Sequence, residues 1–156
     1  MKADIVVKKL IDKNKTIAFM ESCTSGYVAS SLTNVENASK VLKFSAVTYS
    51  NEFKIKMGVE EAIIDKYSVY SIETAKDMSL KISKFAKSDY GVGVTGKLKK
   101  QDENNPYGSD NIVYVSIYDR ENDKYYTCSI EVMYDTREQN KSYVASIIFD
   151  MLCNII

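Results

Sequence analysis

The six residues ESCTSG (21–26) place three hydroxyl groups, a thiol and a glycine directly after an apolar run and directly before a helix-like pattern. A hydroxyl or thiol becomes a nucleophile when a neighbouring base removes its proton. A sharp turn from strand to helix also leaves backbone N–H groups unpaired, and small residues let a ligand approach them. The ordinary structural alternative is a helix cap, which Ser22 or Thr24 could supply.

The absence of histidine limits the chemistry of such a site. None of the 156 residues is a histidine, which excludes a Ser-His-Asp triad, a Cys-His pair and every histidine-ligated metal centre. A serine nucleophile would need another base, and Lys54, just beyond the second expected strand, is the nearest candidate. Its pKa, ordinarily about 10.4, would have to fall by about 3 for the amine to be largely neutral near pH 7.

Net charge and cysteine content limit which kinds of binding partner and which kinds of structural site the protein can have. The 21 basic and 21 acidic residues cancel, so the basic excess of a nucleic-acid or membrane-surface binder is missing and a small-molecule partner is favoured. The apolar run at residues 5–7 is too short for a signal-peptide core or a membrane span, which predicts a cytoplasmic protein. The three cysteines lie far apart without a CxxC pair, which argues against a disulfide framework or a structural zinc site.

The elements that must position these residues follow from hydrophobic periodicity. Strands are expected over residues 16–20, 45–49, 90–95, 112–118 and 125–133. Helices are expected over residues 3–13, 26–32, in two halves of 51–67 broken near Gly58, over 72–86 behind a Ser71 cap, and after a capping box of Asp135 and Glu138.

This order of elements predicts one α/β domain over residues 1–156, a three-layer α/β/α sandwich with a mixed, partly parallel sheet. In such sheets ligands bind beyond the carboxyl ends of the parallel strands. The three expected parallel strands end at Ser22, at residues 49–51 and at residues 95–96. We therefore expect these hydroxyl-rich segments to converge on one edge of the sheet.

The same segments carry a family resemblance. ESCTSG (21–26), VTYSNEFK (47–54) followed by MGV, VTG (94–96) and the late Arg137 resemble the C-terminal domain of the competence/damage-inducible protein CinA, which also occurs as a stand-alone nicotinamide mononucleotide deamidase. The similarity runs from about Thr16 to Phe149. Its most specific piece is TYSNE followed one residue later by lysine.

The resemblance implies hydrolysis of nicotinamide mononucleotide to nicotinate mononucleotide and ammonia, without a metal or an organic cofactor. It implies that Ser22 attacks the carboxamide carbon and that Lys54 is the general base and later the acid that protonates ammonia. Tyr49 and Thr95 would position or polarise these groups. The backbone around residues 24–26 would hold either an oxyanion or a phosphate. The substrate-binding residues expected on this basis are Thr24, Ser25, Gly26, Asn51, Gly96 and the phosphate ligand Arg137.

The chain departs from the family pattern after Gly96. The family usually continues with a loop of the type AGPxGG and later KPVG, whereas residues 97–108 read KLKKQDENNPYG. We interpret the lysines at 97, 99 and 100 as a solvated loop, with attraction of a phosphate as the alternative. Ser25 also stands where the family normally has glycine.

Each candidate residue has an ordinary structural alternative. Lys54 could be a solvated surface lysine, Tyr49 a core tyrosine, Thr95 the end of a strand, and Arg137 a member of an ion pair. At the level of function, the alternatives to an amidohydrolase are a catalytically inactive nucleotide-binding relative with an altered pocket loop and a purely structural or regulatory protein. The tyrosine-rich strand at the hairpin edge is also compatible with a homodimer.

Overall fold

The computed structural model describes residues 1–98 and 110–156 of the chain. Its five strands are β1 (Ile17–Glu21), β2 (Leu42–Val47), β3 (Tyr90–Gly96), β4 (Ile112–Asp119) and β5 (Lys124–Glu131). Its helices are α1 (Ala3–Asp12), α2 (Tyr27–Thr33), the 3-10 turn η1 (Ala38–Lys40), α3 (Asn51–Lys56), α4 (Glu61–Tyr67), α5 (Ile72–Ala86) and α6 (Arg137–Ile155).

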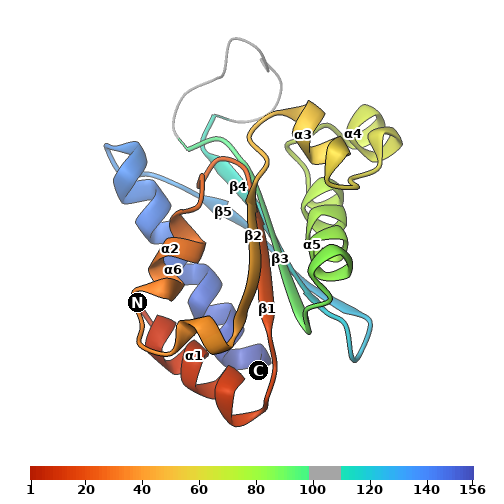
Figure 1. Cartoon of the computed structure of the whole chain (residues 1–156). Coiled ribbons are helices and arrows are strands. Elements are labelled where there is room, and N and C mark those ends of the chain that lie inside the picture. Colours follow the sequence, from red (N-terminus) through yellow and green to blue (C-terminus); the bar gives the residue numbers. More distant parts are fainter. Residues whose placement is uncertain (99–109) are drawn as a thin grey trace.

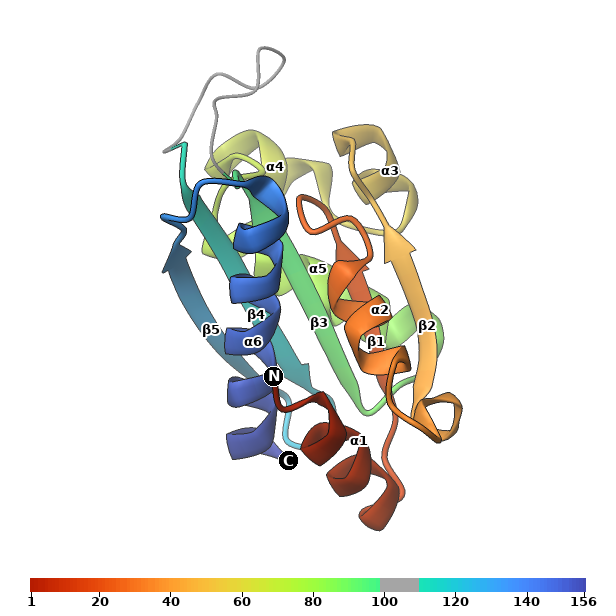
Figure 2. The same cartoon turned by 90° about the vertical axis from the view of Figure 1, so that its left-hand side faces the viewer.

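The strands form one mixed sheet in the order β2-β1-β3-β4-β5. The pairs β1–β2 and β1–β3 are parallel, and β3–β4 and β4–β5 are antiparallel. Helices α1, α2 and α6 lie on one face of the sheet, and α3, α4 and α5 lie on the other (Figures 1 and 2). This confirms the predicted α/β/α sandwich with a parallel part and an antiparallel hairpin edge.

Each face of the sheet is closed by its own apolar cluster. The larger cluster packs side chains of α1, α2 and α6 against one face, with Phe19 and Phe149 fully buried. The smaller cluster joins Met20 to Met78 and Ile82 of α5 on the other face. Alternate residues of β1 therefore point into opposite clusters, as the pleat of a strand requires.

Two glycines of β3 let α5 approach the sheet closely. A Cβ built on Gly91 would stand 2.1 Å from the carbonyl oxygen of Ser79, and one on Gly93 would stand 2.4 Å from that of Ala75. The glycine pair therefore serves close packing between helix and strand.

The helix starts follow the expected chemistry, with one shift. Ser71 accepts a hydrogen bond from the Thr74 amide at 3.1 Å and caps α5 as predicted. The capping box of α6 is formed by Thr136 and Gln139, so the prediction of Asp135 and Glu138 was wrong by one residue. The strand expected at 45–49 is β2 at 42–47, because the half-exposed edge strand has no clear apolar alternation at its start.

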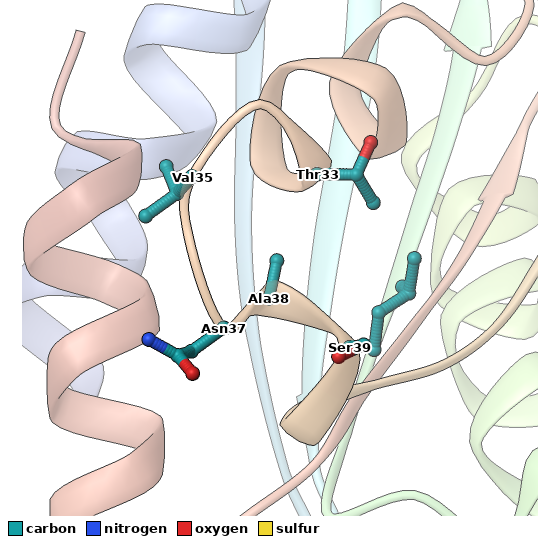
Figure 3. Close-up of a pocket in the computed structure, with 6 residues that line it drawn as sticks. Thr33, Val35, Asn37, Ala38 and Ser39 are labelled. Carbon is teal, nitrogen blue, oxygen red and sulfur yellow. The ribbon is translucent and has the colours of Figure 1, made fainter.

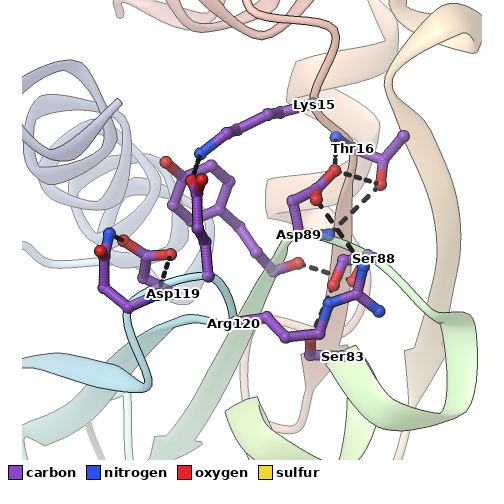
Figure 4. Close-up of polar contacts among 10 residues, drawn as sticks. Lys15, Thr16, Ser83, Ser88, Asp89, Asp119 and Arg120 are labelled. Atoms are coloured by element: carbon purple, nitrogen blue, oxygen red, sulfur yellow. Dashed lines mark hydrogen bonds and ion pairs between the residues drawn. The ribbon is translucent and has the colours of Figure 1, made fainter.

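A polar cluster closes the end of the sheet that is opposite to the candidate site (Figure 4). Asp89 accepts hydrogen bonds from the Thr16 amide at 2.8 Å and from the Thr16 hydroxyl at 3.1 Å, and its carboxylate lies 3.7 Å from Arg120. Ser88 donates to the carbonyl oxygen of Tyr90 at 2.8 Å. These contacts tie the amino ends of β1 and β3 together and account for the polar residues there without a ligand.

Candidate active site

Two side chains meet at the carboxyl end of β1. The Lys54 ammonium donates a hydrogen bond to Ser22 Oγ at 3.0 Å and another to the Thr48 carbonyl oxygen at 2.8 Å. Ser22 is held by its backbone, since its amide donates to the Val94 carbonyl oxygen of β3 at 2.9 Å. Ser50 caps α3 by accepting from the Phe53 amide at 3.2 Å, and this short helix carries Lys54 back toward β1.

Burial sets the charge state of Lys54. The side chain is only 2% exposed, and the loss of hydration lowers the pKa of its ammonium to about 8, with Cys23 acting in the opposite direction. Neither carboxylate that could have kept the amine charged faces it. Glu52 pairs with Lys56 at 2.8 Å on the exposed side of α3, and Glu21 is engaged with α2. The alternative of a solvated surface lysine is therefore wrong.

Glu21 has a role that the sequence interpretation missed. Its carboxylate is fully buried and accepts hydrogen bonds from the backbone amides of Val28 and Ala29, both at 3.0 Å. The carboxylate thus stabilises the first turn of α2 and anchors both ends of the 22–26 loop. A glutamate between a buried strand and a helix start was the available signal. Because Glu21 already takes these amides, the start of α2 is not free for a substrate phosphate.

The loop between Glu21 and α2 has an unusual backbone. Ser25 and Gly26 have φ angles of 55° and 89°, in the left-handed region that glycine adopts most easily. Within the part of the chain that the structure describes, the amides of Thr24 and Gly26 donate to no residue, and the buried Thr24 hydroxyl has no hydrogen-bond partner. These amides are backbone donors that a ligand at this loop could use.

The thiol next to Ser22 is electrostatically unsuited to attack. Burial raises the pKa of the Cys23 thiol to about 12, although the nearby cations Lys54 and Arg137 act in the opposite direction. A thiol of this kind stays neutral at physiological pH. The arrangement therefore favours Ser22 over Cys23 as the nucleophile.

Comparisons with known proteins bear on this arrangement. The family model described as "CinA C-terminal domain" matches residues 1–156. The chain belongs to the CinA C-terminal domain family. A relative from Clostridium kluyveri named "Putative competence-damage inducible protein" is 39% identical over 118 residues, which are 75% of this chain and 28% of the relative. A relative of the same name from Alkaliphilus metalliredigens is 45% identical over 94 residues, 60% of this chain and 23% of that protein. This CinA domain thus spans about a quarter of the length of these relatives.

Solved structures share the fold. The CinA superfamily protein from Klebsiella pneumoniae superposes with a TM-score of 0.87 at 21% identity, over 97% of this chain and 93% of that one. The CinA superfamily protein from Escherichia coli superposes with a TM-score of 0.87 at 22% identity, over 99% of this chain and 88% of that one. At these identities the likeness shows the α/β fold of the CinA domain.

Tyr49 and Arg137 of this CinA domain form a contact across the carboxyl edge. The Arg137 guanidinium donates to the Tyr49 hydroxyl at 3.3 Å, which joins the first residue of α6 to the link between β2 and α3. Tyr49 is 59% exposed, so its alternative as a core tyrosine is wrong. Arg137 takes part in no ion pair within residues 1–98 and 110–156, and its guanidinium stays available to an anion.

The remaining predicted site residues, Thr95, Gly96 and Asn51, lie at the same edge of the sheet, and two of them have contacts within the fold that explain their residue types. The Thr95 hydroxyl is buried and donates to the Val69 carbonyl oxygen at 2.8 Å, so its proton is used within the fold. Gly96 has a φ of 154°, and a Cβ there would stand 2.4 Å from the Ile112 carbonyl oxygen, which makes a close approach of β4 the reason for glycine. Asn51 is the half-buried first residue of α3.

Lys97 contradicts its interpretation as a solvated residue. It is 4% exposed and lies against the ring of Tyr70. The predictions that concern residues 99–109, including Lys99, Lys100 and the Pro106 region, lie outside the described residues. The correction follows from Leu98 and Lys97 turning inward directly after β3, which composition alone could not show.

A separate pocket of about 460 Å³ lies at the opposite end of β2 (Figure 3). Its lining residues are Thr33, Val35, Asn37, Ala38, Ser39 and Leu42, none of which titrates. The described residues contain no group of three His, Cys, Asp or Glu side chains placed to hold a metal ion. Within the same residues, no helix combines the length and apolar character needed to span a membrane.

Proposed function

We propose that this CinA domain is an amidohydrolase that converts nicotinamide mononucleotide to nicotinate mononucleotide and ammonia. The observation that carries the proposal is the 3.0 Å hydrogen bond between Lys54 Nζ and Ser22 Oγ, with Lys54 buried and its pKa lowered to about 8. A buried amine of this kind is partly neutral at physiological pH and can accept the proton of a serine hydroxyl. The nicotinamide substrate comes from the family resemblance.

The reaction runs in two halves with the same pair. Neutral Lys54 takes the Ser22 proton as Oγ attacks the carboxamide carbon, which gives a tetrahedral oxyanion and a charged ammonium. The ammonium then passes its proton to the departing nitrogen, so ammonia leaves and an ester to Ser22 remains. In the second half, Lys54 removes one proton from an attacking water and returns it to Ser22 Oγ, while the carboxylic acid that is released loses the second proton to solvent and becomes nicotinate mononucleotide.

The surrounding groups supply binding and polarisation. The free amides of Thr24 and Gly26 are the donors that could stabilise the oxyanion next to Ser22. Arg137, held by Tyr49 at the exposed edge, would bind an anionic part of the substrate. Thr95 and Asn51 would shape the edge of the site between the strand ends, since the Thr95 proton already bonds to Val69.

The test measures ammonia and nicotinate mononucleotide together in the purified protein. Ser22→Ala and Lys54→Met should each lower kcat at least about 1,000-fold, because removing either member of a nucleophile–base pair removes the shared function. Exposed Ser30→Ala on α2 and exposed Lys56→Met on α3 are the matched controls and should keep activity within about twofold. Folded wild-type protein without turnover between pH 7 and pH 10 would refute the proposal, and retained mononucleotide binding would then favour the inactive nucleotide-binding relative.

A further inference from the structure

Lys97 stands out among the cations of the described chain. Lys54 and Lys97 are the two lysines buried there, with exposed fractions of 2% and 4%. Lys54 has two hydrogen-bond acceptors, whereas no described residue accepts a hydrogen bond from Lys97 Nζ. Its ammonium lies over the Tyr70 ring, whose centroid is 4.6 Å away. An aromatic face offsets only part of the cost of burying an ammonium group.

Lys97 lies on the same side of the sheet as the Ser22–Lys54 pair. Tyr70 belongs to the apolar cluster of Met20 and Met78, between the sheet and α5, and α3 carries Lys54 on that side of the sheet (Figure 1). The carbonyl oxygen of Val69, the residue before Tyr70, accepts a hydrogen bond from the Thr95 hydroxyl of β3 at 2.8 Å. Tyr70 is therefore the next residue after one that contacts β3. Lys97 follows the end of β3, and its contact with the Tyr70 ring places its amine on this face of the sheet.

The charges around Lys97 indicate which kind of ligand would match its amine. Within residues 1–98 and 110–156, Lys97 forms no ion pair, so no carboxylate of the described chain lies within ion-pair distance of its buried amine. An ammonium group has three N–H donors and no acceptor. A phosphate monoester offers three acceptor oxygens and close to two negative charges, and such charge-assisted hydrogen bonds are strong where water is excluded.

We propose that Lys97 binds the phosphate monoester of the substrate on the α3–α5 side of the candidate site. The identity of the substrate rests on the proposed function, but the burial of Lys97 and the lack of an acceptor for its amine among the described residues do not. Lys97 then complements Arg137, the first residue of α6, which contacts Tyr49 at the carboxyl edge. The lysine is a specificity residue for phosphorylated over unphosphorylated substrates.

The experiment compares nicotinamide mononucleotide with the corresponding nucleoside, which lacks the phosphate. Both are assayed for turnover and for stabilisation of the protein against heat, in wild type, Lys97→Met, Lys97→Arg and Arg137→Gln. Lys76→Met is the matched control, because Lys76 lies 4.8 Å from the Tyr125 ring in the same kind of cation–ring contact on α5. Inorganic phosphate alone is a third ligand in the binding assay.

The expected result is a loss of preference for the phosphorylated ligand. Lys97→Met should reduce the ratio of kcat/KM for mononucleotide over nucleoside at least about tenfold, through KM, with the nucleoside value unchanged. Lys97→Arg should keep most of the preference, and Lys76→Met all of it. Stabilisation by inorganic phosphate should fall in Lys97→Met as well.

The outcomes separate this inference from the proposed function. Wild-type protein that binds the mononucleotide in a Lys97-dependent way but never releases ammonia would refute the deamidase and support the phosphate site. An unchanged ratio in Lys97→Met, with Arg137→Gln alone abolishing the preference, would overturn the phosphate site. A Lys97→Met variant that melts several degrees lower and keeps the ratio would assign Lys97 a structural role instead and would equally overturn it.

Discussion

The buried amine of Lys54 makes the stability of the domain depend on pH in a calculable way. Burial lowers the pKa of Lys54 from 10.5 to about 8 in the folded state. Between these values the unfolded chain binds the proton and the folded chain releases it, so the free energy of unfolding rises with pH. Below pH 8 the folded protein carries the full cost of the buried charge, and this cost disappears as the pH rises toward 10.5.

The perturbation is Lys54→Met, which has a similar length and no charge. Integrating the proton-binding difference gives wild type a gain of about 2–3 kcal/mol between pH 7 and pH 10, a gain that the variant lacks. The difference in free energy of unfolding between wild type and variant should therefore change by about 2–3 kcal/mol between pH 7 and pH 10. All other titrating groups are common to both proteins and cancel in the comparison.

Urea unfolding followed by circular dichroism at pH 7 and pH 10 measures this difference. Lys56→Met is the control, because Lys56 lies two residues away on the exposed side of the same helix and should differ from wild type by no more than about 0.5 kcal/mol. A difference between wild type and Lys54→Met that stays within about 0.5 kcal/mol at the two pH values would refute the buried, low-pKa amine.

Three further predictions concern activity and packing. The kcat/KM for amide hydrolysis should rise about tenfold per pH unit below pH 8 and level off above it, because only neutral Lys54 is a base; a flat profile from pH 6 to pH 9 would exclude this role. Glu21→Gln should destabilise the domain by about 1–3 kcal/mol in urea unfolding, since Val28 and Ala29 donate to different carboxylate oxygens and the glutamine would place its NH2 donor against one of these buried amides, while exposed Glu36→Gln should have no measurable effect. Gly93→Ala should cost at least about 2 kcal/mol in the same assay, because its Cβ would stand 2.4 Å from the Ala75 carbonyl oxygen; an unchanged midpoint would show that α5 moves aside freely.

Local sequence patterns were sufficient to predict most of the helices and strands of the fold. Periodicity located the helices and the strands, and the Ser71 cap was assigned to the residue that the structure shows. The errors lie where local signals are weak. The start of β2 is a half-exposed edge whose residues do not alternate, and the cap of α6 moved from Asp135 to Thr136 because two overlapping candidate boxes differ by a single residue.

The candidate site divides in the same way. The residue types of the site could be predicted from the sequence, because the lack of histidine left lysine as the base for a serine. Their convergence could be predicted because parallel strand ends meet at one edge of a sheet. The hydrogen bonds between Glu21 and the start of α2 could not be predicted from the sequence, because a glutamate beside a serine motif suggests a charged residue near the site. Only the folded chain shows its carboxylate turned to the Val28 and Ala29 amides and away from Lys54.

By itself, the sequence determined which groups are present and the order in which the strands present them. It determined the alternating faces of the sheet, the glycines that admit α5, and the absence of histidine from any mechanism. Tertiary structure alone decided the burial of Lys54 beside Ser22 and of Lys97 beside Tyr70. The physical reason is that a lysine's charge state and partners depend on how much water and which acceptors surround its amine, and those neighbours come from elements far apart in the chain.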